Sequence, residues 1–310
     1  MKKKYRDVNG ILLLDKPNFV TSNYALQKTR ILFKAKKAGH TGSLDPLATG
    51  MLPICFGNAT KFSQFLLNAN KNYQVIAHLG ISTNTADSTG SIIKQRTVNI
   101  TEKKLNDVLN YFNGLIYQTV PTYSAIKYNG IPRYKYARKG ITIPSKRRPI
   151  MIHHLKLKRW VKKELELDIL CSKGTYIRSL IDDIGNLLGC GAHVSYLRRL
   201  NVANYITFKL ITLEKLNNIN EKNKNSSNSL FKELDSLLLP IETAISHLPI
   251  MNLSTKESIY FQKNRYLNIN NHTYLKGDFI KITEGIEKKI IGIGKIIDKE
   301  KIFLYQILKK

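Results

Sequence analysis

Residues 37–57 read KAGHTGSLDPLATGMLPICFG, a run rich in residues that favour turns. It contains four glycines, two prolines, one carboxylate (Asp45) and one imidazole (His40). Glycine permits backbone bends that other residues avoid, and a residue that precedes proline is pushed out of the helical region toward extended geometry. Such a loop can hold one carboxylate at a fixed place on the surface, where another chain approaches closely.

The pair Asp45-Pro46 also has a simpler interpretation. Asp is a favoured helix N-cap and Pro a favoured first helical residue, so the pair by itself predicts a capping turn without any catalysis. The glycines on both sides favour the other interpretation, in which the carboxylate is presented as a nucleophile or general base. The residues of the loop alone leave both interpretations open.

The composition points to a polyanionic partner. The chain has 310 residues, of which 43% are hydrophobic, so it can bury a substantial core and is expected to form two domains. Lys and Arg number 50 against 22 Asp and Glu, which gives a formal net charge of +28. A field of that size attracts polyanions, with nucleic acid the first candidate and an anionic membrane the second. A lysine-rich genome would account for part of this excess.

No segment predicts export or membrane insertion. The apolar run near the N-terminus is broken by Asp15 and Pro17, and no stretch approaches the roughly 20 apolar residues of a membrane span. The three cysteines lie far apart without a C-x-x-C pair, which is typical of a reducing cytoplasm and gives no zinc site. The doublet His153-His154 lacks a second pair of ligands, so we interpret it as part of a strand. We expect a cytoplasmic protein without a metal.

Hydrophobic periodicity predicts strands separated by helices. No Gly-x-Gly-x-x-Gly or Gly-Lys-Ser/Thr loop follows a strand, so the pattern indicates an α+β sheet protein without ATP, NAD or another cofactor. The predicted strands cover 8–14, 73–81, 164–171 and 192–202, and the predicted helices cover 21–33 (with a Ser or Asn cap), 58–67, 101–114 and 176–188.

The last third of the sequence differs from the rest in composition and in its predicted elements. Residues 217–229, NNINEKNKNSSNS, are polar and of low complexity, and they predict a flexible loop that builds no core. From 248 onward, one helix and three short apolar strands predict a small β-rich module. We therefore expect a first domain over 1–245 and a second over 246–310.

Residues 120–150 place tyrosines between lysines and arginines, with prolines and glycines as punctuation. Aromatic rings between cations can stack on unpaired bases while the cations neutralise phosphates. An ordinary basic hairpin with its tyrosines in the core fits the same pattern, and both interpretations are open.

A carboxylate covered by RNA tends to take up a proton unless a cation keeps it ionised. Arg178, in the run GTYIRS, is the candidate cation, because its guanidinium can form a bidentate pair with Asp45. Two other interpretations are open. Arg178 binds a phosphate of the RNA instead of Asp45, and Tyr176, in the same run, is only a core aromatic residue.

Several segments together resemble the TruB family of bacterial tRNA pseudouridine synthases. They match in order and spacing from about residue 6 to 240, and they are LLLDKP, GHTGSLDPLATGMLPICFGNATKFSQF, KNYQV, PTYSAIKYNG, CSKGTYIRSLIDDIG and CGAHVSYLRRL. The resemblance implies the pseudouridine synthase fold, with a mixed, mostly antiparallel sheet, a central cleft and a PUA-like C-terminal domain. It also implies that 120–150 is a thumb-like insertion that grips RNA. Departures are small: Ser43 stands where Ala is common, and Tyr24 where an acidic residue is usual.

The resemblance also implies the site. Asp45 would be the catalytic nucleophile, with Arg178 as its salt-bridge partner. Tyr73 would stack on the flipped uracil and is the candidate for proton transfer. The substrate-binding set that the resemblance implies is His40, which fills the gap left by the flipped base, Tyr176 and Leu197, which line the uridine pocket, and Lys16, which supports the catalytic loop.

The implied activity is the isomerisation of uridine 55 in the T-loop of tRNA, without cofactor or metal. Asp45 would attack C1′, add to C6 or remove the C2′ proton, and the sequence leaves all three routes open. The implied partner is the tRNA T-arm, with no obligatory protein partner and a monomeric enzyme. The rival interpretations are a non-catalytic RNA-binding protein or tRNA-folding chaperone and a hydrolase built on Asp45. The hydrolase would need a metal or a second nearby carboxylate, which the loop does not supply.

Overall fold

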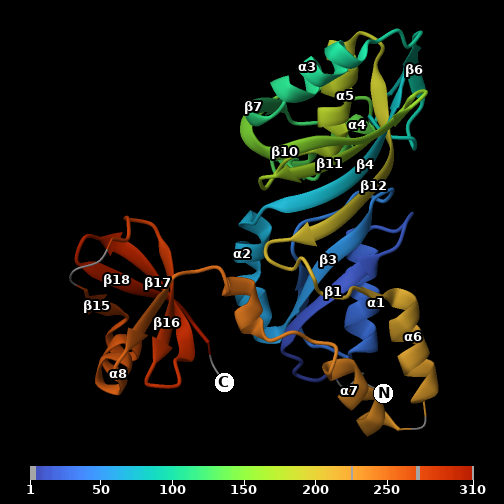
Figure 1. The fold of residues 1–310 in the computed structure, drawn as a ribbon. Coiled ribbons are helices and arrows are strands. Elements are labelled where there is room, and N and C mark those ends of the chain that lie inside the picture. Colours follow the sequence, from blue (N-terminus) through green and yellow to red (C-terminus); the bar gives the residue numbers. More distant parts are fainter. Residues whose placement is uncertain (1–4, 225, 270–272, 309–310) are drawn as a thin grey trace.

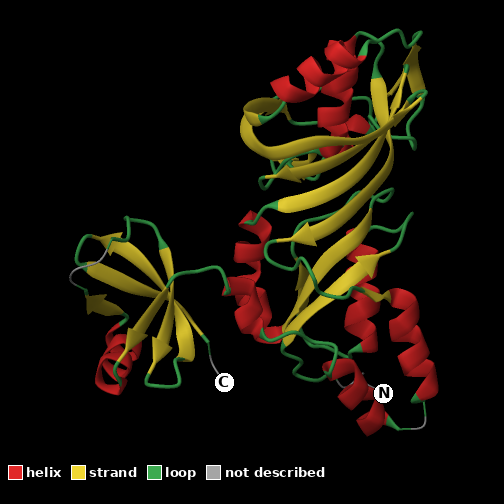
Figure 2. Cartoon of the chain, viewed as in Figure 1, coloured by secondary structure: helices red, strands yellow, loops and turns green. Residues whose placement is uncertain are grey.

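The computed structural model describes residues 5–224, 226–269 and 273–308. The chain forms a large part built on one central sheet and a smaller β-rich domain at the C-terminal end (Figures 1 and 2). Over the described residues, every helix is too short or too polar to cross a membrane.

The central sheet is mixed and mostly antiparallel, as the sequence predicts. Only the pairs β1/β13 and β3/β12 are parallel among its described pairings. In spatial order its strands are β13 (Ile211–Thr212), β1 (Gly10–Lys16), β3 (Thr49–Phe56), β12 (Ala192–Val202), β4 (Lys71–Leu79), β11 (Glu164–Cys171), β10 (Arg147–Val161) and β7 (Gly114–Thr119), with β2 (Ala38–His40) beside β3.

The strand patterns explain how the sheet is covered. In β4 and β11 buried and half-exposed residues alternate with a period of two, so one face of this half of the sheet lies on the core. Strands β1 and β3 are buried almost continuously, because both of their faces are covered. The predicted strand with the doublet His153-His154 is part of β10.

Helices cover the two ends of the sheet (Figure 1). At one end lie α1 (Ser22–Leu32), α6 (Leu213–Lys222) and α7 (Ser227–Asp235); at the other lie α3 (Glu102–Tyr111) and α5 (Ile177–Leu188). Short elements fill the connections: η1 (Gly57–Phe62), α2 (Ser63–Asn68), β5 (Ile81–Thr83), β6 (Ile92–Gln95), β8 (Lys127–Tyr128), β9 (Ile131–Pro132), α4 (Arg133–Ala137) and η2 (Ile241–Ile245).

The prediction of a coreless loop over 217–229 is wrong. Helices α6 and α7 run through most of it, and Ile219 and the neighbouring Leu230 are buried in the main core. The side-chain nitrogen of Asn223 donates to the Ile219 carbonyl and to the Glu233 carboxylate, so this asparagine closes the turn between the helices. The abundance of Asn, Ser and Lys concealed apolar residues at helical spacing. Residue 225 lies outside the described residues.

Two smaller expectations also need correction. The cap of α1 is Thr21, whose hydroxyl accepts from the Tyr24 amide, rather than a Ser or Asn. The long helix expected from 248 begins only after Ser254, whose capping box with Glu257 starts the helix. The residues before it form a strand instead.

The C-terminal domain has its own sheet and its own core. Its elements are β14 (Ile250–Leu253), α8 (Thr255–Asn264), β15 (Tyr266–Asn268), β16 (Phe279–Glu284), β17 (Lys289–Asp298) and β18 (Lys301–Ile307). It rests on α2 of the larger part: the rings of Phe279 and Phe65 meet edge to face at 5.2 Å, and the Tyr305 hydroxyl donates to Gln64 at 3.1 Å.

Gly185 lets α5 pack directly on the start of β12. A methyl group there would overlap the backbone nitrogen of Ala192. An exposed helical Gly→Ala change usually stabilises by about 1 kcal/mol. We expect Gly185→Ala instead to lower the free energy of unfolding by about 2 kcal/mol, because backbone has to move. Urea denaturation measures this. Gly39→Ala, where a methyl group meets nothing within 4 Å, is the control and should change little. An unchanged Gly185→Ala protein would contradict the packing argument.

Candidate active site

Asp45 lies in the loop between β2 and β3. No helix follows it, because the chain turns once and enters β3 at Thr49. The interpretation of Asp45-Pro46 as a helix cap is therefore wrong. The side chain of Asp45 is 35% exposed, so the loop presents a carboxylate at the protein surface.

Arg178 holds this carboxylate with two hydrogen bonds. Its Nε donates to Asp45 Oδ2 at 2.8 Å and its Nη2 donates to Oδ1 at 3.1 Å. The guanidinium is only 6% exposed, and it also donates to the carbonyls of Thr85 and Tyr123. A bidentate pair fixes the direction of the carboxylate as well as its charge. The structure thus brings together the two residues that the sequence paired.

A second carboxylate, missed from the sequence, lies near the same nitrogen of the guanidinium. Asp87 Oδ2 is 3.7 Å from Arg178 Nε, and the Asp87 side chain is 6% exposed. Its Oδ1 accepts from the hydroxyls of Thr85 and Thr89 and from the Thr89 amide. Asp87 comes from the polar loop after β5, which the sequence indicated only as turn-rich. Since its oxygens are occupied and buried, Asp87 acts as a fixed counter-charge for Arg178.

Lys16 supports the loop from beneath. Its side chain is fully buried, and Nζ donates to the carbonyls of Pro17, Val20 and Pro46. Burial lowers the pKa of Lys16 to about 8, and the charge of Asp45 acts in the opposite direction, so the group is an ammonium at neutral pH. Ser22 adds a second tie, because its hydroxyl donates to the Leu44 carbonyl and accepts from the Leu44 amide.

Tyr73 and Leu197 lie on the neighbouring strands β4 and β12, both almost fully buried. Tyr73 is paired across the strands with Arg199. Burial raises the pKa of the Tyr73 phenol, while the Arg199 guanidinium beside it acts in the opposite direction. The phenol is therefore neutral at physiological pH and can donate or relay a proton.

Arg199 is a further buried residue that the sequence did not single out. It is 1% exposed, and its guanidinium donates to the carbonyls of Met51 and Gly42. It therefore links β12 to both ends of the loop that carries Asp45. The sequence signal was weak: an arginine on the inward face of an apolar strand.

Tyr176 stands at the N-cap position of α5, one residue before the helix that carries Arg178. Gln118 of β7 holds its backbone in both directions, because the side-chain amide donates to the Tyr176 carbonyl and accepts from its amide. The guanidinium carbon of Arg148 lies 4.8 Å from the centre of the Tyr176 ring, and Arg148 also bonds the Gly174 carbonyl. Tyr176 is half-buried, so it is not simply a core aromatic.

His40 ends β2 and is half-buried. Burial and the charge of Arg199 lower its pKa, so the imidazole is neutral at pH 7. Its Nδ1 is buried without a hydrogen-bond partner among the described residues. A neutral, half-exposed ring suits stacking on a base better than phosphate binding.

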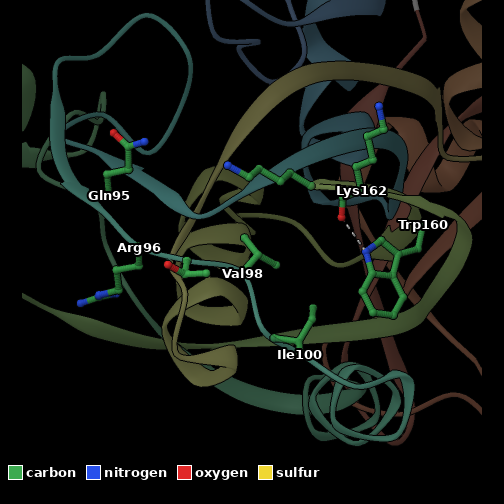
Figure 3. Close-up of a pocket in the computed structure, with 8 residues that line it drawn as sticks. Gln95, Arg96, Val98, Ile100, Trp160 and Lys162 are labelled. Atoms are coloured by element: carbon green, nitrogen blue, oxygen red, sulfur yellow. Dashed lines mark hydrogen bonds between the residues drawn. The ribbon is translucent and has the colours of Figure 1, made fainter.

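A concave pocket of about 530 Å³ lies elsewhere (Figure 3). It is lined by the segment after β6, from Gln95 to Ile100, and by Trp160, Lys162 and Lys163 at the turn between β10 and β11. None of the residues that surround Asp45 lines it. Asp45 and the residues bonded to it therefore lie outside this pocket.

Together these groups can perform one kind of chemistry. The site presents one carboxylate, fixed by an arginine and open to the surface, and the buried, neutral phenol of Tyr73, whose pKa the charge of Asp45 helps to raise. A pair of free carboxylates, which glycoside hydrolysis needs, is not formed by the described residues, because Asp87 is already occupied.

Family models match most of the chain. Residues 30–177 match the model described as TruB family pseudouridylate synthase (N terminal domain), and residues 178–246 match the model described as tRNA pseudouridylate synthase B C-terminal domain. The tRNA pseudouridine synthase B of Photorhabdus laumondii subsp. laumondii is 50% identical over 296 residues, covering 96% of this chain and 94% of its own length. That of Tolumonas auensis is 50% identical over 299 residues, covering 96% and 92%.

Solved structures show the same fold at lower identity. A chain of a Cbf5-Nop10-Gar1 complex aligns with a TM-score of 0.73 and 24% identity, covering 97% of this chain and 84% of that one. A chain of an H/ACA RNP bound to a substrate RNA containing 2′-deoxyuridine gives a TM-score of 0.72 and 23% identity, covering 97% and 85%.

The Lys16 ammonium should be required for the stability of the loop that carries Asp45. Lys16→Met keeps the apolar stem but leaves three carbonyls without their donor, so we expect the free energy of unfolding to fall by about 3 kcal/mol. Faster hydrogen exchange should appear at the amides of Leu44, Asp45, Leu47 and Ala48. Lys37→Met, at an exposed lysine near the same loop, should stay within about 0.5 kcal/mol of the unaltered protein. Equal effects of the two changes would contradict the proposed support.

Proposed function

Because the chain belongs to the TruB family of tRNA pseudouridine synthases, we propose that it converts uridine 55 in the T-loop of tRNA to pseudouridine, with Asp45 as the nucleophile. Pseudouridine formation in tRNA, an isomerisation, is the activity of this family. The position in the tRNA and the role of each residue are our proposal. The observation that supports it best is the surface carboxylate of Asp45, held by both of its oxygens on the buried Arg178.

The reaction moves one bond and one proton. The N1–C1′ glycosidic bond breaks, the uracil turns within the pocket and C5 bonds to C1′. The proton leaves C5 and N1 becomes an N–H, so product and substrate have the same atoms and no oxidant or external group is consumed. In each route open to it, whether attack at C1′, addition to C6 or removal of the C2′ proton, the carboxylate of Asp45 is the reacting group.

The other residues take the roles that the chemistry requires. Tyr73, neutral and beside the pocket, stacks on the uracil and transfers the proton from C5. Tyr176 and Leu197 enclose the ring, so the released uracil stays close to C1′. Lys16 keeps the loop of Asp45 in place.

Access to uridine requires that the base leave its stack. Flipping costs a few kcal/mol, and a ring that occupies the vacated place offsets part of this cost. We assign this role to His40, whose imidazole is neutral and half-exposed.

The rest of the chain binds the RNA. We assign residues 1–245 to a catalytic domain with a thumb-like insertion at about 120–150, and 246–310 to a PUA-like RNA-binding domain. The tyrosines of the insertion are half-buried and pack together, as the rings of Tyr128 and Tyr136 do at 6.0 Å, whereas Lys135, Arg138 and Lys139 point to solvent. We further propose that the enzyme acts in the cytoplasm as a monomer without an obligatory protein partner or cofactor.

Asp45→Asn should separate binding from chemistry. The amide keeps the shape of the loop but is a poor nucleophile, so we expect conversion to fall by about 10³-fold or more. Affinity for RNA should stay within about threefold, since the carboxylate faces the base and not the phosphates. The assay is single-turnover conversion of an unmodified T-arm stem-loop, mapped by carbodiimide labelling and reverse transcription, without added metal.

Asp107→Asn, at an exposed carboxylate on α3, is the matched control and should be fully active. Conversion by Asp45→Asn near the normal rate would contradict the assignment of the nucleophile. Tight RNA binding by the unaltered protein without any conversion would favour a tRNA-folding chaperone instead.

The cations of the insertion should contribute to the salt dependence of binding. Replacing Lys135, Arg138 and Lys139 together with Ala removes up to three phosphate contacts, so the slope of log affinity against log salt should become shallower by about 2. The control replaces the exposed Lys215, Lys222 and Lys232 of α6 and α7, at one end of the molecule (Figure 1). A slope for the insertion variant equal to that of the unaltered protein would show that the insertion does not bind RNA.

A further inference from the structure

Phe19 combines two properties that rarely occur together. Its φ angle is +58°, a left-handed conformation that bulky side chains avoid, and its residue exposure is 75%. A strained backbone is usually tolerated when the side chain gains something from its position, such as burial. Here the ring lies in solvent, so packing within the protein does not explain why an aromatic residue occupies this turn.

The turn that carries Phe19 is fastened to the loop that carries Asp45. The Phe19 amide donates to the Pro46 carbonyl at 2.8 Å, directly after the catalytic residue. On one side, Lys16 bonds the carbonyls of Val20 and Pro46; on the other side, Ser22 bonds Leu44 in both directions. The turn is therefore fixed to the loop of Asp45, which an RNA bound at that carboxylate would approach.

The surroundings of the turn suit a polyanion. Residues 16–36 contain no Asp or Glu, and the exposed cations among them are Lys28, Lys34 and Lys36. Tyr24, which is 48% exposed, is a second aromatic residue in this segment, and its ring lies 5.7 Å from Lys28 Nζ. Exposed aromatic rings on a basic segment are the combination that binds unpaired nucleotides.

We propose that Phe19 is a stacking platform for an unpaired base of the tRNA substrate, outside the pocket that receives the target uridine. Every base has a π-face, so this contact contributes affinity and alignment without reading sequence. The tight turn presents the ring in one position before RNA arrives, which reduces the ordering cost of binding. The proposal rests on the proposed function only in that RNA is the chain presented to Asp45.

Replacement of Phe19 by glycine provides the decisive test. Glycine adopts a φ of +58° without strain, so Phe19→Gly should keep a melting temperature at or above that of the unaltered protein. Loss of one stacked base should weaken RNA affinity and raise KM by about 5- to 100-fold, with kcat at saturating RNA unchanged. Phe19→Trp keeps an aromatic face and should retain normal affinity.

The matched control is Tyr111→Ala, which removes an equally exposed aromatic residue at the end of α3. That helix leads into β7, the far edge strand of the sheet, whereas Phe19 follows β1 near the opposite edge. We expect Tyr111→Ala to bind and convert RNA normally.

An abasic scan of the T-arm stem-loop identifies the stacked base. At one unpaired position, removal of the base should weaken binding as much as Phe19→Gly does, and the two changes together should cost no more than either alone. Normal affinity of Phe19→Gly, or purely additive losses at every abasic position, would overturn the proposal and point to a protein partner for this ring.

The two proposals can fail separately. If the unaltered protein converts uridine 55 and Phe19→Gly is indistinguishable from it, the proposed function stands and the platform is wrong. If no conversion occurs but binding of the stem-loop depends on Phe19, the platform stands and the proposed function is wrong.

Discussion

The structure depends most on one buried guanidinium, that of Arg178. A buried charge is costly unless it is paired and its hydrogen bonds are satisfied. Arg178 meets this requirement with Asp45, Asp87 and two backbone carbonyls, and these partners come from three separate segments of the chain. The loop after β2, the loop after β5 and the base of the 120–150 insertion are therefore held against the start of α5. Loss of any partner would leave the others around an incompletely paired cation.

Buried cations elsewhere in this region act on backbone instead of acids. Lys16 and Lys71 each donate to three carbonyls, and Arg199 donates to two, including that of Gly42. Carbonyl groups at turns need donors, and a single ammonium can satisfy several of them. Burial makes the charged form of such a lysine less favourable, and it lowers the pKa of Lys71 to about 8. The excess positive charge of the chain thus has a structural part as well as a part that attracts RNA.

The sequence predicted β1, β4, β11 and β12, the C-terminal module and the pairing of Asp45 with Arg178, because these depend on local periodicity and on long segments with a fixed order. The buried strand β3 was missed, because its glycines and its proline made it part of the expected loop 37–57. Family membership and the fold are confirmed, whereas the domain boundary and the individual roles of the site residues stay predictions. Asp87 was missed because it lies in a turn-rich loop, and its role depends on a contact with Arg178, 91 positions further along the chain. Helices α6 and α7 were missed because their segment is rich in Asn, Ser and Lys, and its few apolar residues gave only a weak helical pattern. Arg199 and Gln118 were missed for a related reason: each acts through backbone atoms of another segment, which no local pattern reveals.

Charges and aromatic rings contribute differently to RNA binding, because their interactions have different ranges. Electrostatic attraction extends about 8–10 Å at physiological salt and does not distinguish one position along an RNA from the next. Stacking acts only at contact and only where a base is unpaired. A protein of net charge +28 can therefore collect RNA over much of its surface, but the alignment of one uridine with Asp45 has to come from short-range groups. These groups must be rigid, since a displacement of about 1 Å can cost 10²-fold in rate. With Asp45 and Phe19 in their proposed roles, the hydrogen bonds that fasten the turn of Phe19 to the loop of Asp45 meet this requirement, because they join the two groups into one structural unit.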